Sequence, residues 1–217
     1  MSAPPAHRLD IGSHGYLDDA LPPLDASPID PGRLFAFDRP DLPLELEIGS
    51  GKGTFLVQQA PHQPDTNFLG VEYALKYFRV AADRARRHAL PNVRLLHADA
   101  GPLIRHHLAT ATLQHVHIYF PDPWPKARHH KRRFVNADNL TTLHALLAPA
   151  GTVRLATDHA DYFAWMEHHA ASVTHLFDRL PFVPPASADA GELVGSNFER
   201  KYRDQGRTFN GMVLAKR

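Results

Sequence analysis

A doubly wound α/β fold with a mostly parallel sheet of seven strands is the architecture that this sequence predicts. Short apolar runs typical of strands alternate along the chain with segments of helical spacing. The chain has 217 residues, which is enough for one such domain but not for two comfortable ones. Because alternating strands and helices form parallel sheets with right-handed crossovers, we expect helices on both faces of the sheet.

The expected strands are short and follow one another after residue 43. They are residues 44–48, 67–71, 93–97, 115–120 and 152–156, a segment near 175–180, and residues 208–215. Helical spacing is clear in the second intervening stretch, where one face is apolar and comprises Leu75, Phe78, Ala82 and Ala85. A further helix is expected at about residues 159–172, and a short polar helix before the last strand.

The first 42 residues differ from the rest of the chain. Seven prolines interrupt them, and no steady apolar period is present. We therefore expect residues 1–42 to form an N-terminal arm that is extended or partly disordered, and residues 43–217 to form the single globular domain.

Composition excludes several classes of protein. The chain has no cysteine, which excludes disulfides, thiolate metal sites and cysteine nucleophiles. No apolar run approaches the roughly 20 residues of a membrane-spanning helix, and the first residues lack the pattern of a secretory signal. The cytoplasm is the expected compartment. Three pairs of adjacent histidines show no ligand spacing with acids, so we expect no metal site.

A glycine-rich loop, EIGSGKG at residues 47–53, directly follows the first expected strand and opens a helix. Gly49 and Gly51 allow a tight turn and a close approach of the backbone to a ligand. The loop is not a nucleotide P-loop, because Gly53 stands where Ser or Thr would bind magnesium. It also lacks the spacing of a dinucleotide fingerprint, because its glycines follow the pattern G-x-G-x-G.

Carboxylates stand at the ends of three successive expected strands. Glu47 lies at the end of the first, Glu72 ends the second, and Asp99 follows the third. The carboxyl ends of parallel strands share one edge, where Glu72 can accept from a ribose and Asp99 from the exocyclic amine of an adenine. S-adenosylmethionine, which has a ribose, an adenine and a cationic group but no phosphate, fits these acceptors. Helix capping is the alternative role for each acid.

The loop YFPDPWPKARHHKRR, residues 119–133, follows the fourth expected strand. Its three prolines are incompatible with strand and helix geometry. We therefore expect this loop to present Asp122 and Trp124 at the edge of the cofactor cleft. A carboxylate beside an aromatic plane can hold a guanine, because the ring stacks while the acid accepts from the N–H groups. Five of the eight residues 126–133 are permanently basic although the net charge is only +1. This density suits a phosphate backbone, and a solvated face is the alternative.

From about Leu44 to its C-terminus the sequence resembles the bacterial tRNA (guanine-N7)-methyltransferases, which have a Rossmann-like class I methyltransferase fold. The segment FPDPWPKARHHKRR matches the family signature FPDPW-x-K-x-R-H-x-K-R-R at every constrained position. The segments LEIGSGKG, LGVE, HADA, RLATD and SNFE match the other family blocks in the same order. The family usually has Thr where this chain has Ser196, which keeps the hydroxyl group.

The resemblance implies transfer of a methyl group from S-adenosylmethionine to N7 of guanine 46 in the variable loop of tRNA, by a monomer or homodimer. The residues that it implies for the cofactor are Glu47, Gly49, Gly51, Glu72, Asp99 and Asp122, of which Asp122 is also the catalytic residue. Those implied for the substrate are Lys126, Asp158, Ser196, Asn197, Phe198 and Glu199. Those implied for RNA binding are Arg128, His129, His130, Lys131, Arg132 and Arg133.

Two other functions fit parts of the sequence. The tripeptide DPW also resembles the Asp-Pro-Pro-aromatic loop of enzymes that methylate exocyclic amines of adenine or of protein side chains. The basic segment at residues 126–133 favours nucleic acid over a small amine. A non-catalytic RNA-binding module is the second alternative, and the acids at the strand ends argue against it.

Overall fold

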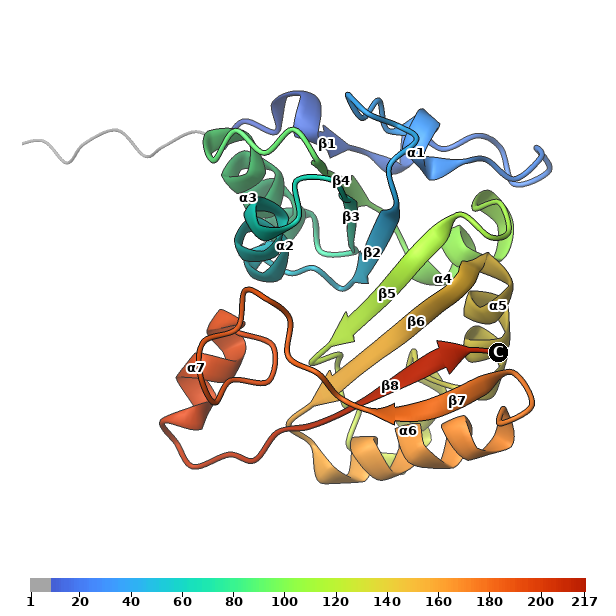
Figure 1. The fold of residues 1–217 in the computed structure, drawn as a ribbon, viewed down its shortest axis with the longest axis vertical. Coiled ribbons are helices and arrows are strands. Elements are labelled where there is room, and N and C mark those ends of the chain that lie inside the picture. The colour runs from blue at the N-terminus through green and yellow to red at the C-terminus, as the bar shows by residue number, and fades with distance from the viewer. Residues whose placement is uncertain (1–8) are drawn as a thin grey trace, which may run out of the picture.

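The structure is a computed structural model that describes residues 9–217 of the chain. Its centre is an eight-stranded sheet with the strand order β1-β4-β3-β2-β5-β6-β8-β7. The strands from β1 to β6 pair in parallel, whereas β8 runs antiparallel to both β6 and β7. Helices lie on both sides of the sheet (Figure 1). The predicted doubly wound α/β fold class is confirmed.

The strands are β1 (Gly15–Tyr16), β2 (Leu44–Ile48), β3 (Asn67–Glu72), β4 (Val93–His97), β5 (Leu113–Tyr119), β6 (Leu147–Thr157), β7 (Phe177–Pro181) and β8 (Asn210–Lys216). The α-helices are α1 (Pro31–Leu34), α2 (Thr54–Gln59), α3 (Leu75–Arg87), α4 (Ala100–Pro102), α5 (Ala137–Leu146), α6 (Ala160–Ser172) and α7 (Asn197–Arg203). The short turns of other helix types are η1 (Gly12–His14), η2 (Asp18–Ala20), η3 (Ala60–His62), η4 (Leu103–His107) and η5 (Ala127–Arg132).

The sheet has one strand more than the seven that the sequence predicts, and the additional strand is β1. Gly15 and Tyr16 pair in parallel with Leu95 and Leu96 of β4. A strand of two residues in a proline-rich segment has no periodic pattern, so sequence alone does not reveal it. β1 forms because β4 would otherwise be an edge strand, and the free backbone groups of an edge strand can pair with another segment.

The described part of the N-terminal arm, residues 9–42, lies against the sheet. Phe35 and Phe37 are buried and join the apolar core. The buried side chain of Arg94, on β4, donates hydrogen bonds to the backbone oxygens of Phe35 (3.1 Å) and Ala36 (2.8 Å). The described part of the arm is thus packed against the domain, and it contains the short helical turns η1, η2 and α1. Its expected boundary at residue 42 stays a prediction, and the expectation for residues 1–8 lies outside the described residues.

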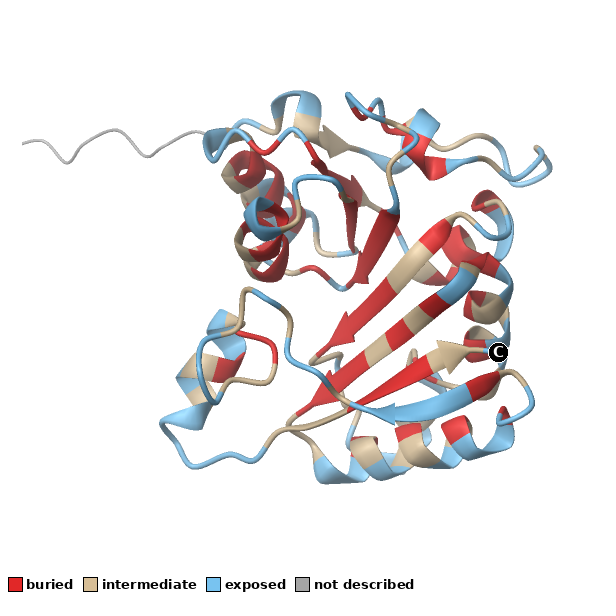
Figure 2. Cartoon of the chain, viewed as in Figure 1, coloured by how far each residue is buried: buried red, intermediate tan, exposed pale blue. Residues whose placement is uncertain are grey.

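The two faces of the sheet carry different side chains. In Figure 1, α2 and α3 cover one face, and α4, α5 and α6 cover the other. Side chains alternate between faces along a strand, so β2 turns Leu44, Leu46 and Ile48 into the core beneath α4–α6 and turns Glu45 and Glu47 toward α2. Figure 2 shows the central strands as buried and the edge strand β7 as mostly exposed. Within residues 9–217, no helix combines the length and apolarity that a membrane crossing requires.

Candidate active site

The carboxyl ends of five neighbouring strands form the edge at which the expected site residues meet. In the order of the sheet these strands are β4, β3, β2, β5 and β6, and they are mutually parallel. The acids at or just beyond their ends are, in the same order, Asp99, Glu72, Glu47, Asp122 and Asp158. Since neighbouring strands lie about 4.8 Å apart, the row from β4 to β5 spans about 14 Å.

The glycine-rich loop leaves an open surface at the end of β2. Gly49 and Gly51 have φ values of +76° and +55°, a left-handed conformation that glycine adopts without strain. A Cβ atom at either position would meet nothing within 4 Å, so space is left in front of the loop. Gly53 differs, because a Cβ there would come within 2.9 Å of the Ala81 Cβ. The first two glycines thus leave room for a ligand, and Gly53 allows α3 to pack closely.

Glu72 connects this loop to β3. Its carboxylate accepts hydrogen bonds from the backbone N–H of Gly51 (2.8 Å) and of Ala74 (2.7 Å). An ionised carboxylate has about four acceptor positions, so two more remain for a ligand. Glu72 therefore shapes the loop as well as facing the edge of the sheet.

Glu47 is the acid with an unsatisfied oxygen. It is 5% exposed, and its Oε2 atom is buried without a hydrogen-bond partner in the part of the chain that the structure describes. Burial, and secondly the nearby charge of Glu72, raises the pKa of Glu47 to about 8. The hydroxyl of Ser50 is also buried without a partner among residues 9–217. A ligand that brings a cation or hydrogen-bond donors would satisfy this corner of the site.

A cleft of about 470 Å³ lies in front of Glu47 and the glycine-rich loop. Tyr119 and Phe120, at the end of β5, line it from the sheet, and the first turns of α7 line it from the opposite side. Figure 1 shows α7 apart from the two helical layers, near the ends of β5 and β6. A hydrogen bond from Asn197 to the hydroxyl of Thr54 (3.3 Å) links α7 to α2 across the cleft. The cleft therefore joins parts of the chain that are far apart in sequence.

The proline-rich loop after β5 is held in an unusual backbone conformation. Phe120 and Trp124 have φ values of +51° and +43°, and the other four non-glycine residues with positive φ among residues 9–217 are alanines. For bulky residues this conformation is costly and persists only where the surroundings enforce it. Phe120 stacks on Phe198 (5.0 Å between ring centroids) and donates its backbone N–H to Ala156 O (2.8 Å). Asp122 follows Phe120 by two residues on this loop and is exposed.

The basic segment after this loop is divided between surface and interior. Lys126, Arg128, Lys131 and Arg132 are exposed, and His129 and His130 are half-buried. The guanidinium of Arg132 lies over the Trp124 ring, 4.9 Å from its centroid, and the ring of His129 meets Trp124 edge-on at 5.9 Å. One of the exposed cations, Arg132, therefore contacts the tryptophan that lies two residues after Asp122.

Arg133 lies inside the protein, although the sequence placed it with the RNA-binding residues. It is 2% exposed, and its guanidinium lies between Tyr162 (4.9 Å) and Trp165 (5.2 Å). It donates to Pro123 O at 2.9 Å and pairs with the carboxylate of Asp161 on α6. A side chain in this position anchors the proline-rich loop and does not face solvent. Sequence could not show this, because Arg132 and Arg133 are chemically identical.

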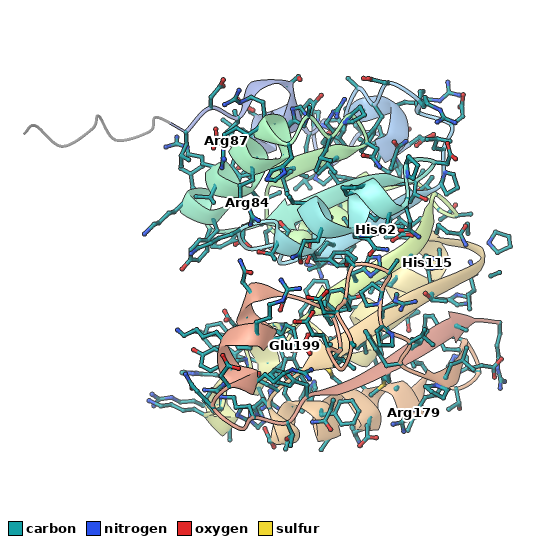
Figure 3. All side chains as sticks on the ribbon, turned by 60° about the vertical axis from the view of Figure 1, so that its left-hand side comes forward. His62, Arg84, Arg87, His115, Arg179 and Glu199 are labelled. Atoms are coloured by element: carbon teal, nitrogen blue, oxygen red, sulfur yellow. The ribbon has the colours of Figure 1, made fainter. Side chains whose placement is uncertain are left out.

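The block at residues 196–199 likewise divides into buried and exposed members. The hydroxyl of Ser196 accepts from Glu199 N (3.1 Å) and caps α7. Glu199 (labelled in Figure 3) is fully buried and accepts from the backbone N–H of Val194 (2.8 Å) and Gly195 (2.9 Å). Ser196 and Glu199 thus hold the turn before α7. The half-buried Ser196 and the exposed pair, Asn197 and Phe198, all line the cleft.

Two of the expected site acids have partners within the protein. Asp99 is exposed, and its Oδ1 atom accepts from Gly101 N (2.8 Å) as the cap of α4. Asp158 is half-buried and pairs with Arg207, whose guanidinium lies over the Tyr202 ring at 3.9 Å. Capping is thus one role of Asp99, and a second oxygen remains available. Within residues 9–217, no three His, Asp or Glu side chains are grouped as metal ligands.

A buried polar chain behind the cleft was not identified from the sequence. His117 bridges Glu45 and Tyr119 through its two ring nitrogens, each at 2.7 Å. Burial, the largest single influence, would raise the pKa of Glu45, but the hydrogen bond from His117 and the nearby charges of His117, His115 and Arg154 together outweigh it and lower that pKa below its usual range. The signal was present, because the alternation of LELEI puts Glu45 on the same face as Glu47. Tyr119 also lines the cleft, so this chain supports the cleft wall.

Comparison with known proteins identifies the family. Residues 41–209 match the family described as "Putative methyltransferase". The tRNA (guanine-N(7)-)-methyltransferase of Nitrosomonas eutropha is 32% identical over 100% of this chain and 99% of that protein. The protein of the same name from Syntrophotalea carbinolica is 35% identical over 94% of this chain and 84% of its own length. The chain belongs to the tRNA (guanine-N7)-methyltransferase family.

Solved structures share the fold of this methyltransferase at low sequence identity. The 16S rRNA methyltransferase KamB aligns with a TM-score of 0.56 and 15% identity, over 80% of this chain and 86% of that one. The aminoglycoside resistance methyltransferase NpmB1 aligns with a TM-score of 0.53 and 15% identity, over 81% and 87% of the two chains. Because the sequence identity is this low, these alignments bear on the fold alone. They confirm the Rossmann-like methyltransferase architecture.

The substitution Glu47→Gln should stabilise this methyltransferase increasingly as pH rises. The folded protein keeps Glu47 protonated up to its raised pKa of about 8, whereas in the unfolded chain the carboxyl ionises near pH 4.5. Between these pH values, ionisation of Glu47 in the unfolded chain favours unfolding. The free energy of unfolding of the parent protein therefore falls by about 1.4 kcal/mol per pH unit through this group. The advantage of the variant in free energy of unfolding should therefore be about 2 kcal/mol larger at pH 7 than at pH 5. Urea denaturation without cofactor measures it.

The control for this pH series is Glu167→Gln, because Glu167 is a surface residue paired with Arg179. Its effect on the free energy of unfolding should stay within about 0.5 kcal/mol at both pH values. A difference between Glu47→Gln and the parent that does not change with pH would show that Glu47 is already ionised in the folded protein.

The neighbouring arginines 132 and 133 provide a matched pair of substitutions. Arg133→Met should lower the free energy of unfolding by about 2–4 kcal/mol, because Pro123 O loses its donor and Asp161 loses its partner. Arg132→Met should change it by no more than about 0.5 kcal/mol, because Arg132 is exposed. Urea denaturation measures both values. Equal losses in the two variants would contradict the assignment of Arg133 as the anchor of the loop.

Proposed function

We propose that this chain transfers the methyl group of S-adenosylmethionine to N7 of guanine 46, in the variable loop of tRNA. The observation that carries the proposal is the cleft in front of Glu47. Three features meet at this edge of the sheet. They are a buried carboxylate with an unsatisfied oxygen, a glycine-rich loop with free space before it, and the strained loop that carries Asp122. The full-length match to relatives named tRNA (guanine-N(7)-)-methyltransferase supports this substrate.

The residues at the strand ends fit S-adenosylmethionine group by group. Glu47 and Ser50 offer the unsatisfied acceptors that an ammonium group needs. Gly49 and Gly51 leave space for a ligand to approach their backbone. Glu72 has free acceptor positions for ribose hydroxyls. Bound S-adenosylmethionine supplies an electrophilic methyl group on a sulfonium, and its positive charge would favour ionised Glu47 over the protonated form.

The acceptor atom determines what the protein must do. N7 of guanine has a lone pair and no proton, so its methylation needs no general base. The protein has to hold N7 in line with the methyl group in a cleft that excludes water, and such positioning supplies much of the rate enhancement. Positive charge spreads onto the purine during transfer, and the carboxylate of Asp122 would stabilise it. Asp122 therefore orients the guanine and stabilises charge.

Aromatic rings around Asp122 provide a place for the target base. Phe198 and Phe120 stack on each other at the cleft, and Trp124 follows Asp122 on the loop. Unpaired bases stack on such rings, and each stacked base contributes about 1–3 kcal/mol. Asn197 and Phe198 would contact the substrate, while Ser196 and Glu199 hold them in place. Asp158 would hold either the donor edge of the guanine or a ribose, and it would exchange or share its partner Arg207.

The RNA backbone would lie along the exposed part of the basic segment. Lys126, Arg128, Lys131 and Arg132 are exposed, and Arg132 lies over Trp124, so phosphates bound there would lie close to the loop that carries Asp122. His129 and His130 lie among these cations and complete this surface. Arg133 acts indirectly, by fixing the loop that carries the other residues.

A nucleoside digest tests the reaction and its rivals together. Purified protein is incubated with S-adenosylmethionine and tRNA that lacks 7-methylguanosine, and the digested nucleosides are analysed by mass spectrometry. The proposal requires 7-methylguanosine, and sequencing of the product should place it at position 46. N6-methyladenosine would identify an amine methyltransferase instead. Binding of tRNA without any methylated nucleoside would identify a non-catalytic RNA-binding module.

The substitution Asp122→Asn should reduce methyl transfer at least tenfold at saturating cofactor and tRNA. It keeps the shape of the side chain but removes the charge, and a tenfold loss corresponds to about 1.4 kcal/mol of barrier. The melting temperature should stay unchanged, because Asp122 is exposed. The matched control Asp138→Asn changes an exposed acid on α5 and should keep parental turnover. Parental turnover in the Asp122 variant would remove this residue from the mechanism.

Replacing Lys131 and Arg132 together by Ala should weaken tRNA binding and flatten its salt dependence. Each lost phosphate contact lowers the slope of log affinity against log salt by about 0.7–0.9. Cofactor affinity, measured by calorimetry, should not change, because S-adenosylmethionine has no phosphate. The control pair is Arg179 and Arg217, which lie at β7 and the C-terminus. If tRNA affinity and salt slope both match the parent, this segment does not bind RNA.

A further inference from the structure

A segment of the N-terminal arm is attached to the domain at both of its ends. We call residues 17–28 the strap. Before it, β1 pairs with β4, and after it Ile29 pairs with Leu108. The second attachment includes hydrogen bonds from Ile29 N to His107 O (2.9 Å) and from Ala109 N to Ile29 O (2.8 Å). The strap therefore crosses from the end of β1 to the segment after η4 and is held at both ends.

A hollow of about 330 Å³ lies between the strap and the beginning of α4. The strap lines it with the consecutive residues Leu21, Pro22, Pro23 and Leu24, and the domain lines it with Asp99, Leu103 and His107. Small-molecule sites have volumes of about 300–1,000 Å³, so the hollow can hold one flat ring system. Asp99 is the acid at the end of β4, which makes the hollow a part of the same edge of the sheet.

The chemistry of the hollow suits a heteroaromatic ring that carries an amine group. Its strap side consists mainly of rigid prolines and of leucines, together with Asp18. Leu24 is 63% exposed, so this leucine packs little in the structure itself. On the domain side, one carboxylate oxygen of Asp99 remains free to accept from an amine. His107 is buried, and its Nδ1 atom has no partner among residues 9–217. An apolar wall opposite these polar groups matches the faces and the edge of a purine.

We propose that the strap forms the outer wall of the adenine subsite of the cofactor, so that the N-terminal arm is a part of the cofactor site. This inference rests on the proposed use of S-adenosylmethionine. The position agrees with it, because β4 is next to β3 and therefore places Asp99 one strand, about 4.8 Å, beyond the ribose acceptor Glu72. Leu24 gains an apolar contact only when the adenine is present. Because both ends of the strap are already attached, binding does not have to order it.

The substitution Leu24→Ser tests the inference. The strap is expected to contact adenine and no other part of the cofactor, so the dissociation constants of S-adenosylhomocysteine and of adenosine should rise by the same factor, about fivefold or more. The melting temperature should not change, because the side chain is already mostly exposed. The control is Leu180→Ser on the edge strand β7, where a 46% exposed leucine lies away from the hollow and both constants should stay parental. Calorimetry measures S-adenosylhomocysteine, and competition against it measures adenosine.

Three results would overturn the inference. Unchanged dissociation constants for both ligands in Leu24→Ser would show that the strap does not touch the adenine. A loss of tRNA affinity in the absence of cofactor would place the strap on the RNA surface instead. If the parent protein itself does not bind S-adenosylhomocysteine, both the proposed cofactor and the strap proposal are wrong. The first two results would contradict the strap proposal but not the proposed cofactor. An equal rise for both ligands with unchanged tRNA affinity supports the strap as the adenine wall.

Discussion

The parallel alignment of β4, β3, β2, β5 and β6 is the constraint on which the site depends. Right-handed crossovers return the chain to the same end of the sheet before each new strand, so every strand finishes at one edge. Acids that are 20 or more residues apart in sequence therefore become neighbours, separated by steps of about 4.8 Å. The cleft, the glycine-rich loop and the proline-rich loop are consequences of this alignment. The edge strand β7 leads the chain to α7 and the cleft, and the antiparallel strand β8 follows α7 and completes the sheet between β6 and β7.

The centre of the sheet is apolar on one face and polar on the other. Beneath α4–α6 the leucines of β2 join a continuous core, whereas the α2 face carries Glu45, His117 and Tyr119 in a hydrogen-bonded chain. Buried polar groups are tolerated when they are paired, and these are. Among the carboxylates, Glu47 is the exception, because one of its oxygens is buried without a partner within the described chain. The protein thus stabilises the polar groups that support the cleft and leaves unsatisfied the group that faces a ligand.

Two buried ionisable side chains keep the loops around the cleft in place. Arg133 binds the backbone of the proline-rich loop from below, between two aromatic rings. Glu199 accepts hydrogen bonds from backbone N–H groups of the turn before α7. Their anchoring explains how Phe120 keeps a strained conformation, because its stacking partner Phe198 belongs to the turn that Glu199 holds. The exposed residues that would meet RNA and substrate therefore depend on buried neighbours that would meet neither.

The sequence by itself determined the fold class, seven of the eight strands and the row of acids at one edge, because strand periodicity and the positions of acids after strands are local patterns. It did not reveal β1, whose two residues are defined only by the free edge of β4. Nor could it distinguish Arg133 from Arg132, or Glu199 from Asn197, because which member of a motif turns inward depends on contacts such as Tyr162 and Trp165. The cleft wall from α7 and the hollow beneath the strap were likewise decided by tertiary structure alone. Both bring together segments distant in the chain, and no local pattern encodes such a contact.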